Sequence, residues 1–167
     1  MISDALTKAL NGQIASEFTA SNHYLAIAAY FALGSLDGWA DFFHRQSEEE
    51  RGHGLKILQF LIDNDAEIHL PAVAEARTDF ADALEAVCSA LTSERKVSGQ
   101  FDALAALATE NRDYRSLQFL QWFISEQVEE EATMGKLVDL VKSGVNLFEA
   151  QQHLPSAEDA EVDAENE

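Results

Sequence analysis

The chain carries a Glu-x-x-His motif, Glu50 to His53, in the middle of a segment with helical periodicity. Residues three apart lie on one face of a helix, so the carboxylate and the imidazole would project together. That face is otherwise apolar, because Trp39, Phe43 and Ile57 fall within roughly 40° of Glu50 on a helical wheel. An unpaired carboxylate is costly to bury, so such groups pair with each other or bind a metal ion. The motif therefore predicts either a buried ion pair or part of a metal site.

Three other long segments with helical periodicity also place polar residues on an apolar face, near the middle of the segment. They are Glu17 in the first segment, with Tyr24 two turns beyond it, Glu94 in the third, and Gln127 and Glu130 in the fourth. The midpoints of similar helices meet in a bundle, so these side chains should form one layer with the Glu-x-x-His motif. Four carboxylates in one buried layer would repel one another, and one or two bound cations would neutralise them. Oxygen ligands with one imidazole and no sulfur suit iron or manganese better than structural zinc.

The elements that must position this layer are four long helices. We expect helices over about residues 3–33, 39–64, 79–108 and 113–142, and a short amphipathic helix over 146–154. Short turns predict two antiparallel hairpins, and the long connection 65–78 can run the length of a bundle. The predicted fold is all-α, a four-helix bundle with one long crossover and a short fifth helix, in one domain over residues 1–155. The tail 156–167 has six acidic residues and no basic ones, and is predicted to be disordered.

The composition narrows the classes of partner. The 11 basic and 30 acidic residues give a formal net charge of −19, which argues against nucleic acid and anionic membranes and is compatible with cations. The longest apolar run, residues 25–33, is shorter than the ~20 residues of a membrane span, and the N-terminus lacks the pattern of a signal peptide. We therefore expect a cytoplasmic protein. The single Cys88 excludes an internal disulfide and a thiolate metal cluster within one chain.

Across the four long segments the motifs resemble those of the non-haem bacterial ferritins, over nearly the whole chain up to about Leu154. The supporting motifs are EFTAS at 17–21, EERGHG at 49–54, Glu94, and FLQWFISEQVEEE at 119–131. The resemblance implies a ferritin-like bundle that assembles into a hollow 24-subunit cage. It also implies iron storage and detoxification, in which an intrasubunit di-iron ferroxidase centre oxidises ferrous iron with dioxygen or hydrogen peroxide and the cage stores the ferric mineral.

The same resemblance implies roles for individual residues. Glu17, Glu50 and His53 would bind the first iron, Glu50 would bridge to a second iron held with Glu94 and Glu130, Gln127 would lie beside the pair, and Tyr24 would hydrogen-bond near it. Glu49, Glu126 and Glu129, with Glu130, resemble the third iron site of bacterial ferritins. For Tyr24 two interpretations stay open, a core tyrosine bonded to Glu94 or a redox-active one.

Two departures bear on the kind of ferritin. Helix four offers Gln127-x-x-Glu130 in place of a second Glu-x-x-His, which disfavours a bacterioferritin-type site. Gly52 stands where a bacterioferritin would be expected to carry a haem-ligating Met, so no haem is expected. An alternative function is a rubrerythrin-like or encapsulated ferritin-like di-iron redox enzyme without its own storage cavity, and another is a metal-free helical interaction module.

Four further histidines lie at no ligand spacing and are expected at the surface. They are His23, His44, His69 and His153.

Overall fold

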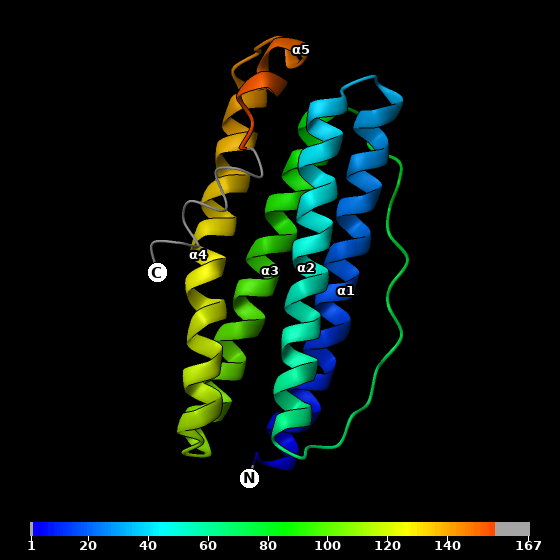
Figure 1. The fold of residues 1–167 in the computed structure, drawn as a ribbon. Coiled ribbons are helices and arrows are strands. Elements are labelled where there is room, and N and C mark those ends of the chain that lie inside the picture. The colour runs from blue at the N-terminus through cyan, green and yellow to red at the C-terminus, as the bar shows by residue number, and fades with distance from the viewer. Residues whose placement is uncertain (1, 156–167) are drawn as a thin grey trace.

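The computed structural model describes residues 2–155, and these residues fold into helices without a β-strand (Figure 1). The four long helices are α1 (Asp4–Leu33), α2 (Asp37–Asp63), α3 (Ala83–Glu110) and α4 (Tyr114–Lys142), and the short α5 (Leu147–Ala150) and the 3-10 helix η1 (Gln151–His153) follow. The predicted all-α bundle is therefore confirmed. The fifth helix is less regular than predicted, because one α-helical turn passes directly into a 3-10 turn. The acidic tail, 156–167, lies outside the described residues.

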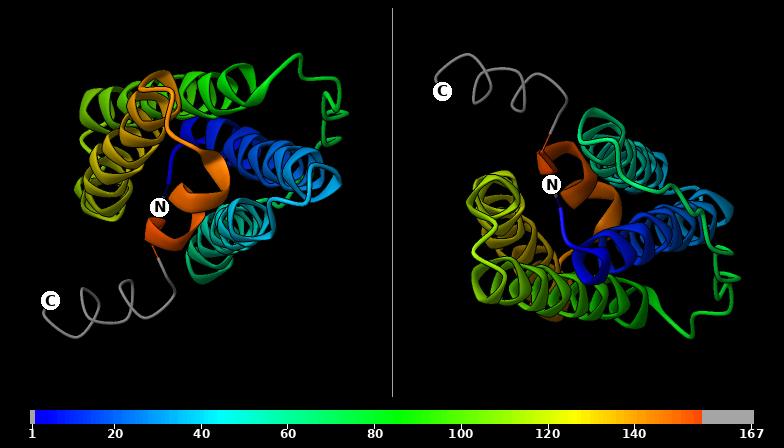
Figure 2. Two further views of the ribbon diagram at one scale, coloured as in Figure 1. Left: turned by 90° about the horizontal axis from the view of Figure 1, so that it is seen from above. Right: turned by 90° about the horizontal axis from the view of Figure 1, so that it is seen from below.

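Two antiparallel hairpins, α1–α2 and α3–α4, form the bundle (Figure 1). The connection 64–82 joins the end of α2 to the start of α3 at the opposite end of the bundle, and it runs alongside α1 (Figure 2). Asn11 on α1 is buried and holds this connection through its side-chain amide. Its Nδ2 donates to the carbonyl of Glu67 at 2.9 Å, and its Oδ1 accepts from the backbone N–H of His69 at 2.7 Å. The long crossover is thus fixed to the bundle by backbone hydrogen bonds.

Side-chain caps define the starts of three long helices. Ser3, Asp82 and Asp113 each accept a hydrogen bond from the backbone N–H three residues further on, at the starts of α1, α3 and α4. Such caps satisfy amides that have no partner within the helix. The cap at Asp82 places the start of α3 at Ala83, four residues later than predicted from periodicity.

The apolar core is divided into two clusters along the bundle axis. One cluster contains Phe31, Phe43 and Met134, and the other contains Ile14 and Phe101, with their respective neighbours. Each long helix contributes to both clusters and carries its predicted polar residues in the interval between them. The polar layer therefore lies at the middle of the bundle, as the midpoint argument predicts.

The C-terminal segment lies across one end of the bundle, between α4 and α2 (Figure 2). Trp39 Nε1 donates to the carbonyl of Leu147 at 3.0 Å, and the backbone N–H of Gly38 donates to Gln151 Oε1 at 3.0 Å. A Cβ at Gly38 would lie 2.8 Å from Cβ of Gln151, so the two segments approach too closely for a side chain there. These contacts close the end of the bundle whose core contains Phe31, Phe43 and Met134.

None of the helices described in residues 2–155 has the length and apolar character needed to cross a membrane.

Candidate metal centre

Six of the predicted site residues converge in the polar layer, and all four long helices contribute. They are Glu17 on α1, Glu50 and His53 on α2, Glu94 on α3, and Gln127 and Glu130 on α4. Each of them is at most 5% exposed. Charged side chains are rarely buried to this extent unless they are paired or bind a metal.

Glu17, Glu50 and His53 form the first group. One ligand atom from each residue lies within 4.8 Å of the others. His53 Nδ1 is 3.6 Å from Glu17 Oε2 and 3.7 Å from Glu50 Oε2, which is too long for a hydrogen bond. Glu17 Oε2, both Glu50 oxygens and His53 Nδ1 are buried and have no hydrogen-bond partner within residues 2–155. Three converging oxygen atoms and one imidazole nitrogen without partners fit a divalent cation such as ferrous iron.

Glu94 and Glu130 form the other side of the layer, and Glu94 is already hydrogen-bonded. The Tyr24 hydroxyl donates to Glu94 Oε1, and Gln127 Nε2 donates to Glu94 Oε2 at 3.0 Å. The interpretation of Tyr24 as a core tyrosine bonded to Glu94 is therefore confirmed, and its redox role stays a prediction. Gln127 Oε1 is buried and lacks a partner among the described residues. The two sides of the layer are unequal, because the first offers free ligand atoms and the second offers a carboxylate with two donors on it.

Burial and mutual repulsion govern the protonation of the layer. Burial raises the pKa of Glu50 well above its ordinary value, and the charges of Glu94 and Glu17 add to this effect. Burial also raises the pKa of Glu130, with a further contribution from Glu94. For His53, burial lowers the pKa, but the carboxylates of Glu17 and Glu50 outweigh it and raise the pKa to about 11. An imidazolium at His53 is thus the internal counter-charge of the layer, and a bound cation would replace its proton.

Glu49, Glu126 and Glu130 form a second group whose carboxylate oxygens lie within 4.8 Å of one another. Burial raises the pKa of Glu49 and of Glu126, although both are more accessible than Glu130. Gln46 Nε2 donates to Glu49 Oε2 at 2.6 Å and so holds that carboxylate. Glu130 belongs both to this group and to the central polar layer, and so it connects the two. Glu129 is exposed and is not part of this group in the described structure.

Trp122 and Lys56 flank the first group, and Lys56 was not among the residues predicted from the sequence. The rings of His53 and Trp122 meet edge to face, with their centroids 5.5 Å apart. Lys56 Nζ lies 3.1 Å from the centre of the Trp122 ring, which is a cation–π contact. The sequence spacing indicates that Lys56 lies near the site, because it follows His53 by three residues on the same helix face. Gln13 and Gln46 were also missed, although each precedes a predicted carboxylate ligand by one helical turn.

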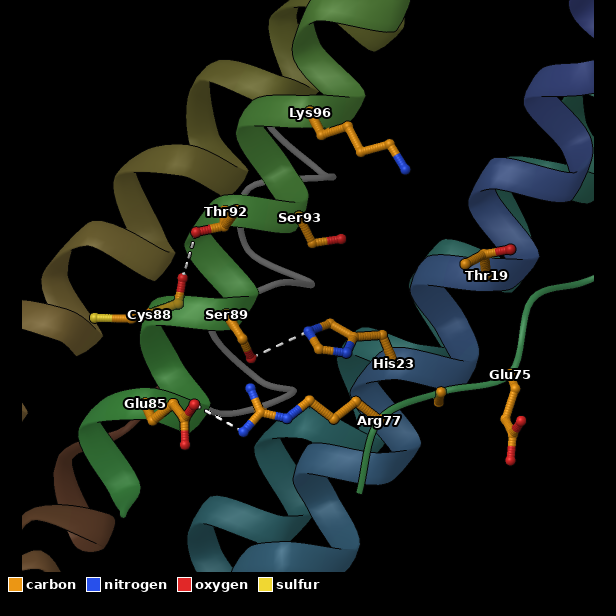
Figure 3. A pocket seen from close by; sticks show the side chains of 11 residues that line it. Thr19, His23, Glu75, Arg77, Glu85, Cys88, Ser89, Thr92, Ser93 and Lys96 are labelled. Carbon is orange, nitrogen blue, oxygen red and sulfur yellow. Dashed lines mark hydrogen bonds and ion pairs between the residues drawn. The ribbon is translucent and has the colours of Figure 1, made fainter. Parts of the chain in front are cut away.

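A groove of about 460 Å³ lies between α1, α3 and the connection 64–82, and no side chain of the polar layer lines it (Figure 3). His23 is half-buried in this groove and not on the surface as predicted, and its Nε2 is 3.2 Å from Ser89 Oγ. Burial lowers the pKa of His23, so the ring is neutral at neutral pH. Arg77 pairs with Glu85 at 2.7 Å, and Cys88 points away from His23 (Figure 3). The groove therefore presents no metal-ligand set.

The three other histidines are exposed, as predicted. They are His44, His69 and His153.

Comparisons with known proteins agree with this geometry. Residues 7–143 match the family model of the ferritin-like domain. The chain is 41% identical to ferritin BfrB of Mycolicibacterium smegmatis over 140 residues, which are 83% of this chain and 77% of that protein. It is 41% identical to a bacterial non-heme ferritin of Staphylococcus aureus over 132 residues, 79% of this chain and 80% of the relative.

Among solved structures, an open-pore ferritin from the hyperthermophilic archaeon Archaeoglobus fulgidus superposes with a TM-score of 0.89 at 29% identity. The match covers 92% of this chain and 96% of the archaeal one. The helical bundle, the buried carboxylate layer and the sequence identity over four-fifths of the chain lead to the same result. The chain belongs to the ferritin family.

Proposed function

We propose that this chain is a ferritin subunit that oxidises ferrous iron at an intrasubunit di-iron centre and stores the ferric product. One observation carries the proposal, namely the convergence of unpartnered, buried ligand atoms of Glu17, Glu50 and His53 beside Glu94 and Glu130. A metal-free interaction module would gain nothing from four buried carboxylates in one layer, because each of them is costly to bury.

The carboxylates serve two purposes in this reaction. Their negative charge stabilises ferric iron more than ferrous iron, which favours the loss of an electron. They also hold two ions close enough to share one oxidant. Two ferrous ions supply the two electrons that reduce dioxygen to peroxide, or hydrogen peroxide to water. Glu50 would bind both ions, since both of its oxygens lack partners in the described chain.

The two irons should bind with unequal affinities. The first would bind to Glu17, Glu50 and His53, where the ligand atoms are free. The second would bind to Glu94 and Glu130, and it must share Glu94 with the donors from Tyr24 and Gln127. The absence of a second Glu-x-x-His on helix four removes an imidazole ligand from that side.

A third iron would bind at Glu49, Glu126 and Glu130, whose oxygens lie within reach of one ion. Glu129, which the family resemblance also assigns to this site, is exposed and gives a matched comparison. We expect Glu126→Gln to reduce anaerobic ferrous binding from three ions per subunit to two, and Glu129→Gln to keep the third ion, because Glu129 is not among the three converging carboxylates. If Glu126→Gln still binds three ions per subunit, the third iron does not bind at these carboxylates.

The subunit should assemble into the 24-subunit cage that the resemblance to bacterial ferritins implies. Large exposed apolar side chains on α1 and the connection, including Leu25, Leu33, Leu70 and Val73, support burial against other copies. No haem is expected, because Gly52 offers no ligand. The single Cys88 is compatible with a reducing compartment and so with the cytoplasmic location that we propose.

The deciding experiment adds ferrous iron aerobically in stoichiometric steps to protein whose mass is known from light scattering. We expect a rapid absorbance change that saturates near two irons per subunit, followed by slower mineral growth at higher iron loads. A dimer or decamer without mineral growth would favour the rubrerythrin-like or encapsulated alternative. Anaerobic titration without saturable ferrous binding would contradict a metal centre altogether and favour the interaction module.

A further inference from the structure

The two carboxylate oxygens of Glu17 have different environments. Oε1 accepts a hydrogen bond of 2.6 Å from Gln13 Nε2, one helical turn earlier on α1. Oε2 has no partner among residues 2–155 and lies 3.6 Å from His53 Nδ1. Both Gln13 and Glu17 are buried, so water does not compete for either oxygen. One oxygen of this ligand is therefore engaged before a cation arrives, and the other faces the site.

Gln13 is itself held by a neighbouring helix. Its Nε2 also donates to Gln100 Oε1 on α3 at 3.3 Å, so both hydrogens of the amide are used. Gln100 Nε2 in turn donates to Ser16 Oγ at 3.2 Å. This short network connects α1 and α3 and fixes the Gln13 amide where it meets Glu17.

We propose that Gln13 is a positioning residue that makes Glu17 a one-oxygen ligand of the first cation. By occupying Oε1, the amide leaves only Oε2 free and prevents the carboxylate from turning to bind through both oxygens. The remaining positions around the ion stay open for Glu50, His53 and the oxidant. Hydrogen bonds to ligating side chains fix their orientation in this way in other metal sites. The inference deepens the proposed di-iron function and rests on it.

Gln13→Leu tests the proposal, because leucine is similar in size and donates no hydrogen bond. Cobalt(II), which does not turn over, serves as the probe in calorimetric titrations and visible absorption spectra of the assembled protein. We expect the first-ion affinity to fall about 10- to 100-fold, the range for loss of such a partner. The second-ion affinity should stay within about threefold, and the d–d bands of the first cobalt ion should change as Glu17 rotates.

Gln59→Leu is the matched control. Gln59 Nε2 donates to Asp63 Oδ1 at 2.7 Å, with the same four-residue spacing, on an exposed part of α2. Its replacement removes a glutamine–carboxylate hydrogen bond remote from the site and should leave both affinities and the spectrum unchanged. Gln13→Asn keeps an amide that is one methylene too short, and it provides the same reading if the leucine variant fails to assemble.

The possible outcomes distinguish the positioning role of Gln13 from the di-iron function itself. Wild-type affinity and an unchanged cobalt spectrum in folded Gln13→Leu or Gln13→Asn would overturn the positioning role and leave the di-iron centre intact. An equal loss at both ions would also overturn it, because that result indicates general loosening of the bundle. Wild-type protein that binds no cobalt would contradict the proposed function itself.

Discussion

Gly54→Ala and Gly52→Ala are the same substitution at positions two residues apart on α2, and the structure predicts that only Gly52→Ala stabilises the protein. A Cβ at Gly54 would lie 2.7 Å from Cε1 and 3.0 Å from Cδ1 of Phe18, and 3.4 Å from Cβ of Glu17. Carbon atoms prefer separations of about 3.5–4.0 Å, so the ring or α1 must move by nearly 1 Å. A Cβ at Gly52 would meet nothing within 4 Å in the described chain.

The magnitudes follow from two competing effects. Alanine is favoured over glycine within a helix by about 1 kcal/mol, and this gain applies at both positions. Overpacking at Gly54 costs about 1–3 kcal/mol. Gly52→Ala should therefore raise the free energy of unfolding by about 1 kcal/mol, and Gly54→Ala should leave it unchanged or lower it by up to about 2 kcal/mol. For a chain of this size 1 kcal/mol corresponds to about 2–4 °C in Tm.

Differential scanning calorimetry of the metal-free proteins at equal subunit concentration measures this difference. We expect the Tm of Gly54→Ala to lie about 2–12 °C below that of Gly52→Ala. Cobalt titration adds a second reading, because displacement of α1 would carry Glu17 away from His53 and weaken the first ion, whereas Gly52→Ala should bind normally. If Gly54→Ala gains as much in Tm as Gly52→Ala and binds cobalt as the wild type does, the close approach of α1 and α2 does not constrain this position.

Three further predictions concern the polar layer. Glu50→Ala should abolish rapid ferrous oxidation in stopped-flow absorbance while the fold and assembly persist. Glu48→Ala, at an exposed position, is the control and should oxidise iron normally. Wild-type rates in Glu50→Ala would show that Glu50 is not part of the mechanism. Tyr24→Phe leaves a buried oxygen of Glu94 without its hydrogen-bond donor. It should therefore lower the free energy of unfolding by about 1–3 kcal/mol, which is measured as a lower Tm. An unchanged Tm would contradict a stabilising role for this hydrogen bond. Because the pKa of His53 is raised to about 11 in the metal-free protein, the ring holds a proton at pH 7 that a cation must displace, so cation affinity should rise with pH. Titration calorimetry in two buffers of different ionisation enthalpy should show proton release, and a binding enthalpy independent of the buffer would refute this.

Periodicity predicted the long helices to within a few residues, because burial on one face imposes a regular spacing of apolar residues. The largest error is the start of α3, predicted at 79 and observed at Ala83. Phe80 falls inside the predicted range, but it lies in the connection and packs edge to face on Tyr30 and His23. The Asp82 cap then begins the helix. An apolar residue that anchors a loop cannot be distinguished from the first turn of a helix by spacing alone.

The central layer itself follows from the sequence. A carboxylate at the middle of an apolar stripe must point into the bundle, and helices of similar length bring their midpoints together. Glu17, Glu50, His53 and Glu94 could therefore be placed in one layer before any contact was known. A helical wheel does not distinguish Glu130 from Glu131, because both residues lie near the apolar stripe of α4.

The tertiary structure decided what depends on the rotation and approach of neighbouring helices. Glu130 is buried in the layer, whereas Glu131 accepts from Ser98 Oγ at 2.5 Å at the α3–α4 boundary. The hydrogen bond from Gln13 to Glu17 depends on the contact between Gln13 and Gln100 on α3, which orients the Gln13 amide. A sequence gives the direction of each side chain around its own helix axis. Which oxygen is hydrogen-bonded and which stays free for iron depends on distances of a few ångströms between helices, and only packing sets these.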